Sequence, residues 1–361
     1  MSELKLGYFC FMKKIHLILI GLLPIQWLGL SFIKNYPSWV ETYYSQNFYP
    51  FLFNIYRFFF DKIPFSIGDL LYGIMIIYIS RKMIKMFKSK KIKWLIVLRN
   101  GLSFLSLILL IFNTNWGLNY YRIPLYKKLN YNIKYDENQL EKTFDILIIA
   151  SNKLHKRLSN SDSLPVRISY PKDFIAQKIE DEFNFDLDKL KPIPYLKNSL
   201  WGTLLSYMGY AGYLNPFTLE SQTNSKIPKL DYIITSAHEM AHQLGIASES
   251  EANFIAFYNC INHSDPFIQY SGYTFALRYC YSELFKANPK KAEAKIQALT
   301  PGILKNILEL SMFWKLHSNP FEPILKKGYD SFLKANGQSK GIKSYNDMVS
   351  LVIAYLEKES L

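Results

Sequence analysis

Three apolar segments among the first 122 residues constrain this chain more than any other feature of its sequence. Residues 15–33 contain no Lys, Arg, Asp or Glu, and at about 1.5 Å per helical residue they nearly span the core of a bilayer. Two further apolar segments follow, and the first of them is long enough only if its helix starts near Ser66. We therefore predict a membrane anchor over residues 1–122 with three transmembrane helices, at about 15–33, 66–83 and 95–116.

The distribution of charge predicts which ends of these helices face the cytoplasm. Residues 1–122 hold 15 Lys and Arg against 4 Asp and Glu, so +11 of the formal charge of +14 lies there and +3 lies beyond. Seven of the basic residues fall in 81–93, between the second and third segments. By the positive-inside rule this loop and the N-terminus are cytoplasmic, and the chain after about residue 118 is on the outer side. A basic surplus among apolar segments does not suit a phosphate-binding surface, so nucleic acid is not an expected partner.

From residue 123 onward the sequence has the mixed charge and helical periodicity of a folded domain. The apolar residues of 138–158 recur at helical spacing, and the last helix is expected at 345–356. Residues 166–226 are richer in Pro, Gly and Tyr and hold the candidate strands, for example 168–170 and 204–214. The expected fold class is mainly α with a small β component, in a domain over residues 123–361.

The three cysteines do not predict a disulfide framework. None of Cys10, Cys260 and Cys280 belongs to a C-x-x-C pair that would indicate a zinc or redox site. Cys260 and Cys280 are expected to be buried apolar residues, with a disulfide between them as the alternative in an oxidising compartment.

The segment DYIITSAHEMAHQLG carries the clearest chemical signal. It is predicted to be one helix with Asp231 as its N-cap and Gly245 at its end. His238 and His242 are one helical turn apart, which brings two imidazoles to the same side of the helix within reach of one metal ion. Glu239 can then take a proton from a water bound to that ion. This H-E-x-x-H pattern predicts a zinc site with Glu239 as the catalytic base.

Zinc requires a third protein ligand, and two glutamates are candidates. Glu249 and Glu251 both follow the predicted helix, in the segment IASESEANF. Glu251 has capping-box spacing from Ser248, which already explains its presence, so Glu249 is the preferred ligand and Glu251 the alternative. Asn253 lies one turn after Glu249 and is expected to orient a ligand from the second shell.

H-E-x-x-H followed by E-x-x-A-N resembles the gluzincin metallopeptidases, which include thermolysin-like and membrane-bound CAAX-processing enzymes. By that resemblance His238, His242 and Glu249 match the metal ligands, Glu239 the general base and Asn253 the second-shell acid. The chain departs from the pattern in spacing, because only six residues separate His242 from Glu249. Gly245 also stands where metzincins place a glycine, and Ser248, a poor ligand, stands at the position of their third histidine.

A narrower family resembles more of the chain. Segments in the same order, covering about residues 37–356, are similar to those of bacteroidete membrane proteins classed as domain of unknown function 3810: PFSIGDLLY, NWGLNYYRIPL, GYLNPFT, HEMAHQLGIASESEANF and GIKSYNDMVSL. The resemblance implies three anchoring helices and a zincin-like α+β domain. It implies a multi-pass protein of the bacterial inner membrane with a cytoplasmic N-terminus and a periplasmic C-terminal domain.

These features together predict a membrane-anchored zinc metallopeptidase that hydrolyses peptide bonds of a peptide or protein substrate. The alternative is a membrane protein of zincin fold that binds or senses and does not catalyse, although retention of Glu239 argues against it. GYAGYLNPFT, which precedes the metal helix, is the expected substrate-binding edge strand by analogy with zincins. An oxyanion donor is not singled out among the candidates Tyr210, Tyr213, Tyr270, Tyr273, His263 and His317.

Overall fold

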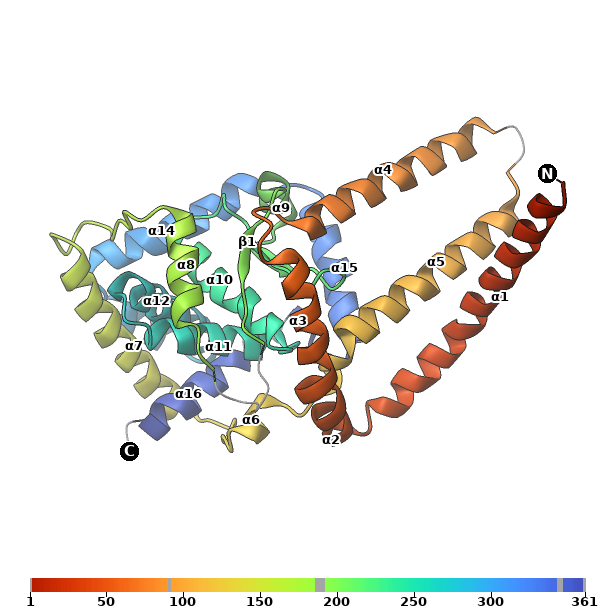
Figure 1. The fold of residues 1–361 in the computed structure, drawn as a ribbon. Helices are drawn as coiled ribbons and strands as arrows, with labels where there is room; N and C mark the ends of the chain where they lie inside the picture. Colours follow the sequence, from red (N-terminus) through yellow and green to blue (C-terminus); the bar gives the residue numbers. More distant parts are fainter. Residues whose placement is uncertain (1, 90–91, 186–191, 343–346, 360–361) are drawn as a thin grey trace.

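A helical domain and three projecting helices make up the molecule (Figure 1). The computed structural model describes residues 2–89, 92–185, 192–342 and 347–359. The projecting helices all leave the domain on the same side, and the three predicted membrane segments fall on them, one on each: α1 (Ser2–Ile33), α4 (Ile67–Lys88) and α5 (Trp94–Asn115).

Within the described residues, two helices are long and apolar enough to cross a membrane. They are Lys14–Ile33 of α1 and the whole of α5. α4 does not meet the same criteria, and its second half carries basic side chains, namely Arg81, Lys82, Lys85 and Lys88. The structure therefore supports two candidate spans, one of them near the N-terminus, where a signal segment has the same composition.

α1 and α5 pack along each other (Figure 1). His16 Nδ1 lies 2.9 Å from Ser103 Oγ, and Gln26 Nε2 donates to Ser106 Oγ at 3.0 Å. The two serines are buried between the helices, whereas outward apolar side chains such as Leu17 remain exposed. Small residues at the contact and apolar residues outside it are typical of helices that pair within lipid.

Short segments join the projecting helices to the domain and pack into it. They are α2 (Pro37–Trp39), the π-helical η1 (Val40–Phe48), α3 (Tyr49–Phe60) and the 3₁₀-helical η2 (Gly117–Tyr121). Tyr49, Phe53 and Trp116 form a buried cluster with Leu219 and Ala247 of the domain. Residues of the predicted anchor thus contribute directly to the packing of the helical domain.

The larger hydrophobic core lies among the helices of the domain. α7, α10, α11, α12 and α16 meet there, and the middle helix, α10, is buried on nearly all of its surface. The bounds of the helices are α6 Leu125–Lys128, α7 Glu137–Leu158, α8 Lys172–Glu182, α9 Gly202–Met208, α10 Lys229–Gln243, α11 Glu249–Ile261, α12 Pro266–Ala287, α13 Pro289–Ile296, α14 Pro301–His317, α15 Glu322–Ala335 and α16 Met348–Glu359.

Three short strands form a sheet beside α10. β3 (Ser221–Thr223) is central, β1 (Leu196–Asn198) pairs with it in parallel, and β2 (Gly212–Leu214) pairs with it antiparallel. The mainly α class with a small β component is confirmed. The prediction of a strand at 168–170 was wrong, and most of 204–214 is helix or turn, since only its last three residues are strand.

Several other local predictions can be compared with the structure. The amphipathic helix predicted from residue 138 is α7, and it starts with a capping box between Asp136 and Gln139. Cys260 and Cys280 are buried free thiols, so they are not paired with each other. The predicted start of the last helix, at Tyr345, lies outside the described residues, and α16 is described from Met348.

A buried ion pair connects the start of the chain to the end of α10. Arg122 donates from Nη2 to Glu41 Oε1 at 2.7 Å and from Nε to Glu41 Oε2 at 3.0 Å. Its Nη1 donates to the carbonyl oxygens of Leu244 and Gly245 at 3.2 and 3.1 Å. Lys128 Nζ lies 2.7 Å from Glu41 Oε1. Burial alone would raise the pKa of Glu41, but Arg122 and Lys128 outweigh it and lower that pKa to about 2.

Replacing Glu41 is expected to destabilise the fold. Glu41→Gln leaves Arg122 buried without its counter-charge, which costs about 3–5 kcal/mol of unfolding free energy. Because the pKa of Glu41 is below its unfolded value of 4.5, its contribution is present above pH 4.5 and is lost as pH falls towards about 2. Thermal unfolding of the detergent-solubilised chain between pH 3 and 7 measures both effects.

Glu137→Gln is the matched control, because Glu137 forms an exposed ion pair with Lys291. This variant is expected to unfold close to the wild-type temperature, since exposed pairs contribute little. Equal unfolding temperatures for Glu41→Gln and Glu137→Gln would contradict the assigned role of the buried pair.

Candidate metal centre

α10 presents both histidines of the H-E-x-x-H motif beside the sheet. The helix begins at Lys229, two residues before the predicted N-cap, and Pro228 precedes it. Asp231 is therefore in the first turn, where it accepts hydrogen bonds from Arg278 at 2.8 Å and from the Trp314 indole at 3.2 Å. A carboxylate near a helix N-terminus is favoured by the helix dipole, so Asp231 still stabilises this end.

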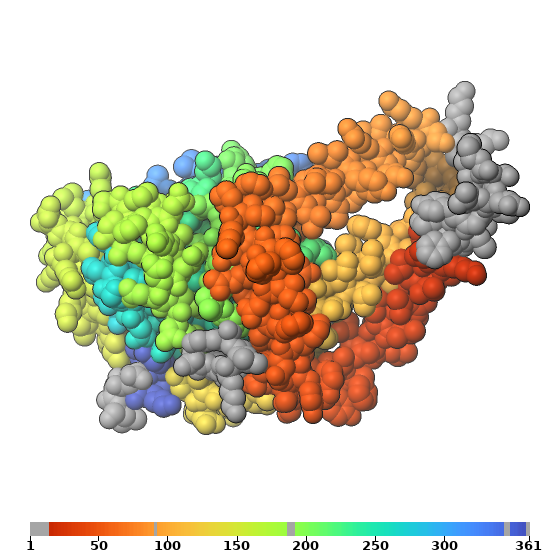
Figure 2. Space-filling view, in the orientation of Figure 1, coloured from red at the N-terminus to blue at the C-terminus, as the bar shows by residue number. Residues whose placement is uncertain are grey.

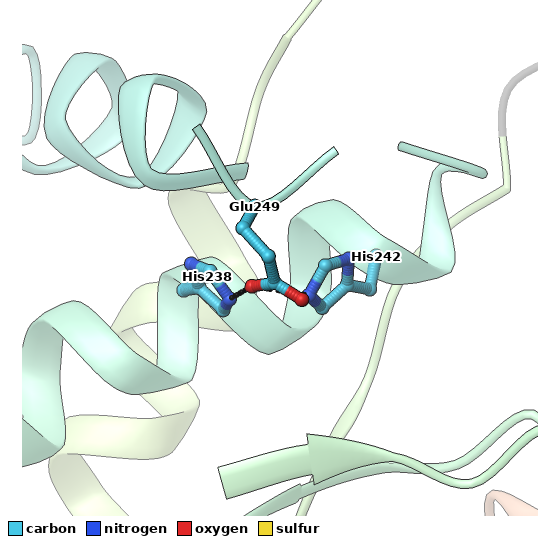
Figure 3. A group of neighbouring side chains, drawn as sticks. All are labelled: His238, His242 and Glu249. Carbon is cyan, nitrogen blue, oxygen red and sulfur yellow. Dashed lines mark ion pairs between the residues drawn. The ribbon is translucent and has the colours of Figure 1, made fainter. Parts of the chain in front are cut away.

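The structure brings His238, His242 and Glu249 together (Figure 3). Glu249 Oε2 lies 3.2 Å from His238 Nε2 and 3.6 Å from His242 Nε2. The two imidazole rings are 4.6 Å apart and nearly perpendicular. The candidate ligand atoms of the three residues all lie within 4.8 Å of one another, which makes this group able to hold a metal ion.

The two separations measured from Glu249 are close to those around a tetrahedral ion. Ligand atoms about 2.0–2.2 Å from a tetrahedral metal are about 3.3–3.6 Å from each other. Of the two distances from Glu249 Oε2, 3.2 Å is just below that range and 3.6 Å is at its upper limit. Two imidazole nitrogens and one carboxylate oxygen also form a donor set that suits zinc.

The turn after α10 fixes the orientation of His242. His242 Nδ1 lies 2.6 Å from the carbonyl oxygen of Ile246 and donates to it, so Nε2 is the ring nitrogen that faces Glu249. Gly245 has a φ of +75°, and a Cβ there would lie 2.9 Å from Asn119 Oδ1. Both observations require glycine at this position. Burial lowers the pKa of His242, but the charge of Glu249 outweighs it and raises that pKa to about 9.

Two aromatic residues that the sequence did not single out support the histidine and the glutamate. Trp116 Nε1 donates to the carbonyl oxygen of His242 at 3.2 Å, and the two rings meet edge to face at 5.8 Å. Tyr329, on α15, donates its hydroxyl to Glu249 Oε1 at 2.7 Å. That contact leaves Oε2 directed at the histidines. Tyr329 follows Glu249 by 80 residues, so no local pattern could have revealed it.

Glu249 stands at the start of α11, whereas Glu251 is directed elsewhere. The histidines lower the pKa of Glu249 well below its usual range despite burial, which by itself would raise it. Glu251 Oε1 accepts from the backbone N–H of Leu125 at 2.7 Å, and burial raises its pKa to about 7. The capping box predicted between Ser248 and Glu251 was wrong, because the Ser248 side chain caps no backbone N–H in the described chain.

Asn253 is buried one turn further along α11. Its Nδ2 has no hydrogen-bond partner within the residues that the structure describes. Because this amide donates to none of the three candidate ligands in the described part of the chain, the role of Asn253 in orienting them stays a prediction.

His238, His242 and Glu249 are called the metal-binding group below. Glu239 lies between this group and β2, at the edge of the sheet. A Cβ at Gly212 of β2 would come within 2.8 Å of Glu239 Oε1, so glycine is what allows this close approach. Burial raises the pKa of Glu239 to about 7, although the neighbouring histidines oppose the shift. Glu239 Oε2 is buried without a hydrogen-bond partner among the described residues.

The six candidate oxyanion donors are scattered through the fold. Tyr210 packs edge to face on Tyr329, with ring centroids 5.8 Å apart, and Tyr329 in turn contacts Glu249. The other five side chains contact residues outside the group: Tyr213 donates to Asp69, Tyr270 to Asn306, Tyr273 packs on Phe257, His263 lies beside the Lys178 carbonyl and His317 beside that of Phe313.

The fold and the site define a mainly helical protein with a His-His-Glu group that can hold a metal. The chain matches the family described as "Protein of unknown function (DUF3810)" over residues 44–353, and it belongs to that family. This confirms the narrower of the two resemblances. No curated protein and no solved structure matches the chain.

Glu249→Gln is expected to abolish tight metal binding, whereas Glu251→Gln is expected to retain it. Removing a ligand costs more than the 10–100-fold that loss of an outer-shell partner typically costs, and a glutamine at 251 can still accept from Leu125. Competition with a chelator, using zinc as the probe, measures both affinities. If zinc affinity fell by a similar factor in both variants, the assignment of Glu249 as the third ligand would be rejected.

Tyr329→Phe is expected to weaken zinc binding by about 10–100-fold, because Glu249 Oε1 loses the hydrogen bond that orients the carboxylate. The control is Tyr207→Phe, which removes the hydroxyl of a half-exposed tyrosine on α9. If the two variants bound zinc with equal affinity, the hydrogen bond from Tyr329 would not contribute to metal binding.

Proposed function

We propose that the protein is a membrane-anchored zinc-dependent metallopeptidase of zincin type, which hydrolyses peptide bonds on the periplasmic side of a bacterial inner membrane. The observation that carries the proposal is the convergence of His238, His242 and Glu249 beside the free carboxylate oxygen of Glu239. Two histidines and one carboxylate from the protein leave a fourth position open, which is typical of catalytic rather than structural zinc sites.

Zinc bound there would supply a Lewis acid that polarises a carbonyl group and makes water more acidic. Glu239 supplies the proton transfer: its Oε2 accepts a proton from the attacking water and returns it to the nitrogen of the leaving amine. A pKa near 7, raised by burial, suits a group that must both accept and release a proton near neutral pH. The carbonyl of Ile246 and the hydroxyl of Tyr329 hold His242 and Glu249 in position meanwhile.

The edge of the sheet offers a place for an extended substrate. β2 lies at one edge of the order β1-β3-β2, and its Gly212 lies directly against Glu239. A peptide that pairs with the outer side of β2 would run past Glu239 in an extended conformation, in the manner of β-strand addition. GYAGYLNPFT was the segment expected to contain such a strand, and β2 is its GYL portion.

The arrangement of the projecting helices supports a position across a membrane. The end of α4 and the start of α5 are the ends farthest from the helical domain (Figure 1). Arg81, Lys82, Lys85 and Lys88 of α4 and Lys93 just before α5 are at those ends, and such residues are retained on the cytoplasmic side. With α1 and α5 as spans and α4 as a third, the metal-binding group is on the opposite, periplasmic side.

Glu239→Gln is expected to keep zinc but lose hydrolysis. The amide preserves the size of the side chain and removes the proton acceptor, so kcat should fall by about 10²–10⁴-fold. The full-length protein in nanodiscs is incubated with a peptide library, cleavage is followed by mass spectrometry, and zinc content is measured in the same samples.

Wild-type cleavage rates in Glu239→Gln would reject Glu239 as the base. Zinc-loaded wild-type protein that cleaves no peptide would instead favour the alternative, a binding or sensing protein of the same fold.

A further inference from the structure

An apolar surface lies on the domain between the two projecting helices α4 and α5. α9 lies beside the start of α4, and α15 lies beside the end of α5 (Figure 1). We call this the α9–α15 surface. Its large apolar side chains are exposed to the outside of the molecule: Leu200, Trp201 and Leu204 at α9, and Phe321, Ile324 and Phe332 at α15.

Two contacts place this surface at the level where the projecting helices enter the domain. The Trp201 indole donates to the carbonyl oxygen of Asp69 at 3.2 Å, and its ring lies against Gly73 of α4. Phe332 meets Phe112 edge to face at 5.9 Å. Phe112 belongs to the span Trp94–Asn115, three residues before its end. The surface therefore borders the outer ends of helices that have the composition of membrane spans.

α15 has the composition of a helix that lies at a membrane surface. Beside its exposed apolar residues it carries Lys326, Lys327 and Lys334. Lys326 and Lys334 each pair with an acid one turn earlier, so their ammonium groups remain near the surface. Lysines flanking an apolar stripe allow such a helix to bury the stripe among acyl chains while its charges stay at the headgroups.

The surfaces of α4 and α5 indicate what covers the apolar side chains of the α9–α15 surface. The flanks of α4 and α5 are themselves apolar and exposed, and Figure 2 shows open space between the two helices. If these helices cross a bilayer, acyl chains fill the space between them and reach the α9–α15 surface. The same lipid that surrounds α4 and α5 would thus cover the α9–α15 surface, and no other partner is required to cover it.

We propose that the α9–α15 surface lies in the interfacial layer of the bilayer and holds the metal-binding group against the membrane. The proposal rests on the membrane anchoring in the proposed function, and not on zinc or hydrolysis. The same helix that contacts lipid through Ile324 contacts Glu249 through Tyr329. The metal-binding group is therefore separated from the bilayer by about one helix diameter, roughly 10 Å.

Quenching by brominated lipid tests the proposal in the full-length protein. Ile324→Cys is made in a Cys10→Ser background, since Cys260 and Cys280 are buried, and is labelled with an environment-sensitive fluorophore. The protein is placed in phosphatidylcholine–phosphatidylglycerol vesicles with bromine near the top of the acyl chains. Ile149→Cys is the matched control, because Ile149 on α7 and Ile324 are both 67% exposed. Phe104→Cys, on α5, reports insertion of the span.

Loss of fluorescence at positions 324 and 104, with none at 149, is the expected result. Phe321→Cys gives an independent reading at a second exposed position. Quenching at 104 with none at 324 and 321 would overturn the lipid contact of the α9–α15 surface but leave the membrane anchoring standing. Absence of quenching at all positions would overturn the membrane anchoring together with it. Contact quenching between labels on two chains at 324 would show a second copy there and would also overturn it. Zinc content and hydrolysis, measured separately, do not affect the readout.

Discussion

The end of α10 depends on hydrogen bonds from the N-terminal part of the chain. The last carbonyl groups of a helix have no partner within it, and burying them unpaired is costly. Here the Tyr49 hydroxyl donates to Gln243, the Trp116 indole to His242, and the Arg122 guanidinium to Leu244 and Gly245. Glu41 in turn neutralises Arg122. The helix that carries both histidines is thereby stabilised by residues that adjoin the projecting helices.

The geometry of the metal-binding group follows from this end of α10. The positive φ at Gly245 turns the chain so that Ile246 reaches His242 Nδ1 and α11 starts with Glu249 facing the histidines. Only six residues separate His242 from Glu249, and this turn is how so short a connection suffices. Tyr329, which is 80 residues further along the chain, donates a hydrogen bond to the other carboxylate oxygen, Glu249 Oε1. Local and distant contacts therefore orient the same side chain in complementary ways.

The sequence predicted what depends on local spacing and failed where distant contacts decide. The i, i+4 relation of His238 and His242 needs only a helix, and it was anticipated. Glu249 was preferred over Glu251 from the sequence, but the capping box given as the reason is absent. What engages Glu251 is the backbone N–H of Leu125, more than a hundred residues away. The apolar run at 204–214 fits either a helix or a strand by pattern, and Gly209, with φ of +78°, ends a helix before the strand begins. The resemblance to the DUF3810 family covered more of the chain than the local patterns did, and the family match over residues 44–353 confirms it.

The hydrogen bonds that cross from the N-terminal segments to α10 mean that the helical domain depends on chain segments that adjoin the projecting helices. A cut within η2, between Trp116 and Arg122, would separate Glu41, Tyr49 and Trp116 from the carbonyl groups and the arginine to which they are hydrogen-bonded. The liberated fragment would carry both histidines on a helix whose end is unsupported. Loss of the N-terminal segments would therefore weaken the helix that carries both histidines, and a fragment with an intact α10 includes the chain from Glu41 onward.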